Sequence, residues 1–118
     1  MEGSSDLAAL QARLARFRDE REWSRFHSPG NLAKAISVEA AELLEPFLWV
    51  AGESEVEVLR THREEVEAEL ADVLIQCLNF AGATGIDVLA AVNRKIEVNE
   101  ERYPVEKARG NARKHTEL

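Results

Sequence analysis

The chain has 118 residues, a formal net charge of −7 and no basic stripe. A chain of this length forms one domain with one core, and its acidic balance argues against binding nucleic acid or an anionic membrane. The single cysteine, Cys77, excludes an intrachain disulfide framework and favours a reducing, cytoplasmic location. Residues 1–6 lack the basic start and apolar run of a secretory signal, and polar residues interrupt the apolar-rich stretch 73–92, so no membrane span is predicted.

The pattern predicts an all-α protein, because apolar residues recur at helical spacing and no stretch alternates as a strand does. Asn31 and Asp87 are expected to cap the second and fourth helices, and Pro46 is expected to kink or loosen the end of the second. The polar tail, 105–118, could be irregular. The predicted helices span, in chain order, residues 6–23, 31–50, 55 or 61 to 83, and 87–103.

Short loops between these helices favour an antiparallel four-helix bundle. The third helix is apolar nearly all round from Val73 to Leu78, so it must be covered on every side. Three partner helices in so small a chain do not suffice for that cover. We therefore expect a homo-oligomer.

Two pairs of acids lie in the apolar seams of the second and third helices. Glu39 and Glu42 are three residues apart, as are Glu69 and Asp72, so each pair shares one helix face. Buried carboxylates without partners cost several kcal/mol each, so a cation between the pairs is one interpretation. Acid pairs three apart are also common on solvated faces, as we expect for Glu64, Glu65 and Glu67, and periodicity alone leaves both interpretations open.

An all-carboxylate site favours Mg²⁺ or Mn²⁺, with Ca²⁺ as an alternative. A ferritin-like di-iron site needs Glu-x-x-His on two helices, and none of the histidines follows a Glu by three. Zinc is disfavoured because no cluster of Cys and His is present. Since substrate phosphates usually complete a Mg²⁺ site, the acids indicate phosphate chemistry, and the sequence has no P-loop to hold the phosphates.

Several stretches resemble the MazG-like nucleoside triphosphate pyrophosphohydrolases, and most of all the dCTP pyrophosphatase branch of that family. The resemblance covers nearly the whole chain from Phe17 onward. The double acid motif, with an Asp closing the second pair, is a fairly specific part of it. The stretches that carry it are residues 20–27, Asn31-Leu32, 38–42, Phe47-Leu48-Trp49, 69–75, Asn99 to Pro104, 108–110 and 113–118.

The resemblance implies one all-α MazG-like domain over residues 1–118. It implies Mg²⁺-dependent cleavage of a nucleoside triphosphate to the monophosphate and pyrophosphate, tetramers, and a preference for dCTP and its 5-modified forms. Glu39, Glu42, Glu69 and Asp72 would be both the metal ligands and the catalytic acids. A dUTP-preferring all-α hydrolase and a non-catalytic helical oligomerisation or metal-binding module are the alternatives.

Aromatic and basic residues outside the acid pairs are candidates for substrate binding. Trp23 and Trp49 either pad helix ends or form a wall against the base, and the resemblance favours the wall, with His27 beside them. A second set lies along one face of the fourth helix and its end; it is either a solvated basic face or, as the resemblance implies, the contact for the triphosphate and sugar. That set is Lys95, Asn99, Arg102 and Tyr103. Gln76 stands where close members of the family often carry Tyr.

Overall fold

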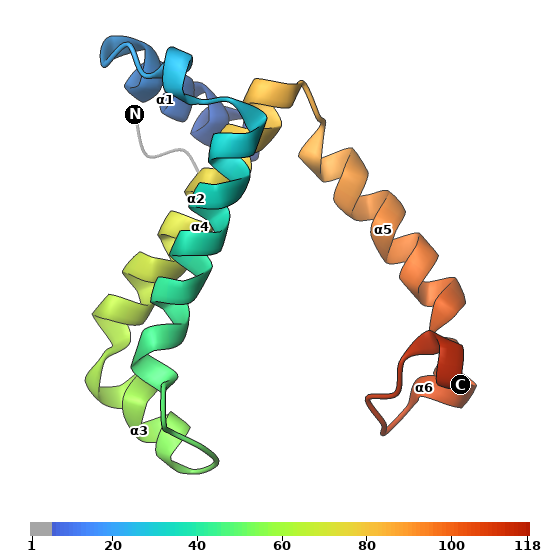
Figure 1. Cartoon of the computed structure of the whole chain (residues 1–118). Helices are drawn as coiled ribbons and strands as arrows, with labels where there is room; N and C mark the ends of the chain where they lie inside the picture. Colours follow the sequence, from blue (N-terminus) through green and yellow to red (C-terminus); the bar gives the residue numbers. More distant parts are fainter. Residues whose placement is uncertain (1–5) are drawn as a thin grey trace. The chain divides into compact units, whose positions relative to one another are not determined.

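The computed structural model describes residues 6–118; Met1–Ser5, on which the interpretation of a missing secretory signal mainly rests, lie outside it. The all-α prediction is confirmed, since no strand occurs among the described residues. The chain divides into two compact units, Met1–Gly85 and Ile86–Leu118. The helices, labelled in Figure 1, are α1 (Leu7–Glu20), α2 (Pro29–Leu44), α3 (Ser54–Thr61), α4 (Arg63–Thr84), α5 (Val88–Arg102) and α6 (Val105–Ala108), with 3₁₀ turns η1 (Ser24–Phe26), η2 (Glu45–Phe47) and η3 (His115–Glu117).

The first unit is built on α4. Helix α2 packs along α4 over the most extensive interface in the unit, and α1 and α3 make smaller contacts with α4. Figure 1 shows α2 and α4 running side by side. Leu32 of α2 and Ala81 of α4 are buried in this unit, with 2% and 4% of their surface exposed. The small side chain of Ala81 occupies little space, which suits a position covered by a neighbouring helix.

The end of α1 positions Trp23. Glu22 has a φ of 54°, in the left-handed region, and the Trp23 amide donates to the Arg18 carbonyl at 3.0 Å while the Glu22 amide donates to Asp19 at 3.1 Å. These two bonds form a Schellman motif, which normally brings the residue after the turn against the last helical turns. The Trp23 ring accordingly meets the Phe17 ring edge to face at a centroid distance of 5.7 Å.

The start of α2 corrects one expectation. Asn31 was predicted as the N-cap, but the cap is Ser28, whose hydroxyl accepts from the Asn31 amide at 3.2 Å. Pro29 follows directly, and proline is favoured at the first helical position because its φ already suits a helix. Asn31 lies inside the first turn, where its side-chain amide donates to the Phe26 carbonyl at 3.2 Å and ties η1 to the helix.

The later part of the first unit departs from the predicted bounds. Helix α2 ends at Leu44 and the chain continues as the 3₁₀ turn η2, which contains Pro46 and confirms that this proline loosens the end of the helix. Of the two predicted starts of the third helix, the one near residue 61 agrees with α4, whereas the stretch from residue 55 forms a separate helix, α3, divided from α4 at His62, which has a φ of −120°. Gly85 closes α4 with a φ of 70°, a conformation that glycine adopts without strain.

The second unit begins with α5, whose N-cap is Asp87, as predicted. The Asp87 carboxylate accepts from the Ala90 amide at 3.1 Å, and α5 ends at Arg102, before Pro104. The tail is more ordered than predicted, since it forms α6 and η3. Its His115 ring packs edge to face on the Tyr103 ring, with the centroids 5.7 Å apart.

No single helix in the described part of the chain is both long and apolar enough to cross a membrane, although α4 and α5 taken as a bent pair meet the criteria of length and composition.

Candidate functional site

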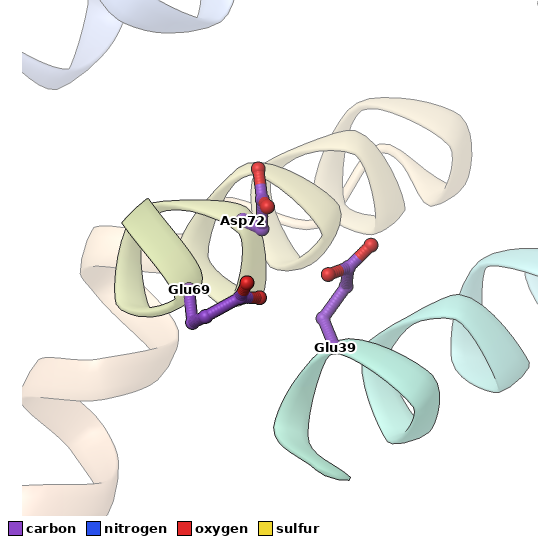
Figure 2. Close-up of side chains that lie close together, drawn as sticks. All are labelled: Glu39, Glu69 and Asp72. Atoms are coloured by element: carbon purple, nitrogen blue, oxygen red, sulfur yellow. The ribbon is translucent and has the colours of Figure 1, made fainter. Parts of the chain in front are cut away.

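Three acids from two helices of the first unit converge. Glu39 comes from α2, while Glu69 and Asp72 come from successive turns of α4, and one carboxylate oxygen of each lies within 4.8 Å of the others. Figure 2 shows Glu69 and Asp72 side by side on α4 with Glu39 opposite them. The convergence follows from the long α2–α4 interface, which places the inward face of each helix against the other.

Glu39 and Glu69 are half-buried and incompletely satisfied. The Oε2 atom of each is buried and has no hydrogen-bond partner among the described residues. A buried anionic oxygen without a partner lowers the stability of the fold, so binding of a cation or a proton at such atoms is favourable. An all-oxygen cluster of this kind is the ligand set that Mg²⁺ and Mn²⁺ prefer, and the donor chemistry therefore fits a hard divalent cation.

The electrostatics of the cluster favour neutralisation. Burial is the main cause that raises the pKa of Glu39, and the charges of Glu42 and Asp72 raise it further. Burial also leads in raising the pKa of Glu69, followed by the proximity of Glu42, Asp72 and Glu39. Glu42 thus adjoins both carboxylates, although it lies outside the tight group of three. All four predicted acids consequently occupy one region of the first unit.

A cleft of about 750 Å³ adjoins the acids, and Asp72 belongs to its lining. One wall is formed by apolar side chains of α1, among them Leu10, Leu14 and Phe17, together with Trp23 and His27. The opposite wall is α4. Two of the predicted substrate-binding residues, Trp23 and His27, therefore lie beside the acid cluster.

The cleft also contains residues that sequence reasoning missed as site residues. Gln76 and Asn79 line its α4 wall, and Arg13 and Arg18 line its α1 side. The Arg18 guanidinium donates to Asp19 at 2.8 Å. The signal for the two amides was present, because they continue on α4 the same spacing that places Glu69 and Asp72 on one face.

The remaining predicted residues lie elsewhere. Trp49 follows η2 with a φ of 66° and 95% of its surface exposed, and it is absent from the described residues that line the cleft. The other four belong to the second unit, where Tyr103 is half-buried against His115 and the rest are exposed. These are Lys95, Asn99, Arg102 and Tyr103.

The fold and the acid cluster define an all-α protein with a candidate centre for a divalent cation beside a cleft. The model of the MazG-like family matches residues 34–118. The chain belongs to the MazG-like family, which confirms the resemblance inferred from the sequence.

Curated relatives carry a more specific name. The chain is 40% identical over 106 residues to dCTP pyrophosphatase 1 of Homo sapiens and 39% identical to that of Bos taurus. The alignments cover 88% of this chain but only 62% and 63% of the relatives, so the chain spans less than two thirds of their length. The fold is similar to the crystal structure of a pyrophosphatase from Archaeoglobus fulgidus DSM 4304, with a TM-score of 0.82 and 44% identity over 88% of this chain and 97% of that one.

Proposed function

We propose that this protein hydrolyses a nucleoside triphosphate to the monophosphate and pyrophosphate with the help of Mg²⁺, for which Mn²⁺ can substitute. The proposed substrate is dCTP or a 5-modified dCTP, and the proposed role is sanitation of the nucleotide pool. The names of the relatives and of the similar crystal structure support this class of reaction.

The observation that carries the proposal is the convergence of Glu39, Glu69 and Asp72 within 4.8 Å beside a cleft. A purely structural role does not account for it, because Glu39 and Glu69 each keep a buried oxygen that has no hydrogen-bond partner in the described part of the chain. Such oxygens lower the stability of a protein that has no cation to bind. This cost argues against the alternative of a helical oligomerisation module, since a scaffold gains nothing from unpaired acids in its seam.

Each acid has a part in the proposed reaction. Glu39, Glu42, Glu69 and Asp72 would hold the cations, and Glu39 or Glu42 would accept the proton of the attacking water. When bound, Mg²⁺ would offset the negative charge of the phosphate oxygens and lower the pKa of that water.

The substrate-binding part of the proposal assigns the base to aromatic residues and the phosphates to cations. Trp23 offers a flat face in the cleft with His27 near it, and Trp49 offers an exposed one. Cationic and polar side chains of the second unit would contact the triphosphate and sugar, because an acidic protein needs local cations for an anionic substrate. Those side chains are Lys95, Asn99, Arg102 and Tyr103.

The proposal includes a cytoplasmic homo-oligomer, with a tetramer favoured over a dimer, that binds no nucleic acid or membrane. The net charge of −7 and the single cysteine support the location and the absence of these partners. Exposed apolar side chains outside the cleft, such as Leu70 of α4 at 49% exposure, support the oligomer.

The decisive experiment incubates the protein with dCTP, dUTP, dATP and dGTP and measures released pyrophosphate. We expect turnover that EDTA abolishes and Mg²⁺ or Mn²⁺ restores, with kcat/KM for dCTP at least about tenfold above that for the purine nucleotides. Glu69→Gln should lower kcat by more than about 100-fold. That loss is larger than the one typical of residues that only orient a metal ligand, because Glu69 is itself a proposed ligand.

Glu65→Gln is the matched control, since Glu65 lies on the same helix and is exposed. It should keep the activity of the natural sequence. Full activity of Glu69→Gln would contradict the metal centre, and a clear preference for dUTP would replace the proposed substrate while leaving the reaction standing.

A further inference from the structure

Two amide side chains meet in the cleft. Gln76 and Asn79 are both half-buried on α4 and both line the cleft. The Asn79 side-chain nitrogen donates to Gln76 Oε1 at 3.3 Å. This bond uses one donor of Asn79 and the acceptor of Gln76, so the pair still offers the Gln76 Nε2 donors and the Asn79 Oδ1 acceptor.

The amide pair lies in line with the acids on α4. Residues 69, 72, 76 and 79 follow at alternating spacings of three and four, which places them along one face of the helix. At the rise of an α-helix, Gln76 and Asn79 lie about 6 Å and about 10 Å beyond Asp72 along the axis. A nucleotide whose phosphates are held near Asp72 can therefore extend its base toward the amides.

The facing wall of the cleft is largely apolar, although Arg13 and Arg18 also belong to its α1 side. It is lined by Leu10, Leu14 and Phe17 of α1, and the Trp23 ring packs edge to face against the Phe17 ring. An aromatic wall accepts the flat face of any base and does not distinguish one from another. Discrimination in this cleft must come from polar groups that meet the edge of the base. Besides His27 and the two arginines, the lining offers the amides of α4, which supply a neutral donor and a neutral acceptor side by side.

We propose that Gln76 and Asn79 determine base specificity by pairing with the hydrogen-bonding edge of cytosine, an inference that rests on the proposed nucleotide hydrolysis. Cytosine presents an amino group beside an unprotonated ring nitrogen. Asn79 Oδ1 accepts from the amino group N4, and Gln76 Nε2 donates to N3. Substituents at C5 lie outside this pair of bonds, so 5-modified cytosines keep it.

Uracil reverses the pattern. It places the O4 carbonyl against Asn79 Oδ1 and the N3–H group against the Gln76 amide, so acceptor meets acceptor and donor meets donor. A site with polar groups left unpaired by the wrong ligand discriminates more strongly than a site that only misses an apolar contact. While the bond between the amides keeps this direction, from Asn79 Nδ2 to Gln76 Oε1, the pair separates two bases of the same size and the same stacking face.

The test compares kcat/KM for dCTP and dUTP in the natural protein, Gln76→Met and Asn79→Leu. Gln76→Met keeps an unbranched side chain of similar length and removes the amide, and Leu is a stronger helix former than Asn. The control is Gln11→Met, the same change at a half-buried residue of α1 outside the lining of the cleft. Far-UV circular dichroism verifies that each variant is folded.

We expect the natural protein and Gln11→Met to prefer dCTP over dUTP by at least about tenfold, and both cleft variants to lose this preference to within about threefold. The requirement for Mg²⁺ should stay unchanged in all of them. Two separate variants keep the test valid if one of them fails to fold. Absence of pyrophosphate from every nucleotide would overturn the proposed function itself. An active protein that prefers dUTP, prefers neither pyrimidine, or keeps its dCTP preference in folded cleft variants would overturn the amide-pair inference alone.

Discussion

Glu39 and Glu69 are the residues at which folding and function oppose each other. Each keeps a buried oxygen without a hydrogen-bond partner among the residues that the structure describes, and each lies close to other acids. Burial and the neighbouring carboxylates raise the pKa of both. The folded chain without a cation therefore binds protons more readily at these positions than the unfolded chain does.

This raised pKa gives a pH dependence of defined sign. A carboxyl group with a higher pKa in the folded state stabilises the fold below its unfolded pKa, and the stabilisation is lost as pH rises through the folded pKa. Without metal, the melting temperature of the natural protein should therefore fall from about pH 5 to neutral pH more steeply than that of Glu39→Gln, which has no charge to acquire. Thermal melts in EDTA across this range measure the difference.

Glu65→Gln is again the control, because it removes an exposed charge from α4 and should leave the slope unchanged. Adding Mg²⁺ at neutral pH should raise the melting temperature of the natural protein. At a Mg²⁺ concentration 100 times its dissociation constant, the free energy of unfolding should increase by about 2.7 kcal/mol. Equal pH slopes for the natural protein and Glu39→Gln would contradict the electrostatic account of the cluster.

At the scale of elements, the turn after α1 positions the aromatic side chains that line the cleft. Its Schellman motif requires a left-handed residue, and the sequence places Glu22 there with a φ of 54°. An L-residue with a side chain pays about 1–2 kcal/mol for this conformation. The strain is tolerated because the turn brings Trp23 against Phe17 and into the cleft.

Glu22→Gly should therefore stabilise the protein. Relief of the strain exceeds the added entropy of the unfolded chain, so we expect a gain of about 0.5–1 kcal/mol, or roughly 2–4 °C in Tm. Ala12→Gly, an exposed change inside α1, should instead cost about 1 kcal/mol. Differential scanning calorimetry distinguishes the two, and a loss of stability in both variants would show that Glu22 makes a contact worth more than its strain.

At the scale of the whole molecule, the chain leaves many large apolar side chains exposed. On α5 the exposed positions Leu89, Val92 and Ile96 recur at helical spacing, with exposures of 59%, 50% and 51%. Contiguous apolar surface of this kind is typical of interfaces between proteins. This exposed apolar surface agrees with the homo-oligomer that we predicted because the third predicted helix is apolar nearly all round.

Light scattering at micromolar concentration should report a dimer or, as we expect, a tetramer. Val92→Glu places a charge in the apolar stripe of α5 and should lower the molar mass or the melting temperature. Arg94→Glu, an exposed change on the same helix that alters charge more strongly, should leave the assembly intact. A stable monomer of the natural protein would rule out the oligomer.

The sequence alone predicted the helical class, the acid pairs and the family. These features depend on local spacing, since a helix face follows from residues three and four apart. The Asp87 cap was predicted for the same reason. The Ser28 cap was missed because Pro29 and Gly30 suggest a break, whereas proline in fact begins α2.

Tertiary packing decided how close the faces of separate helices come to one another. Periodicity indicated that Glu39 and Glu69 face inward, but only the α2–α4 interface brings them and Asp72 within 4.8 Å of one another. Likewise, only the packing of α1 on α4 forms the cleft that unites Trp23 with Gln76 and Asn79 while Trp49 stays exposed. The physical reason is that helical spacing is set by backbone hydrogen bonds within one segment, whereas a site requires side chains of separate segments to fit together.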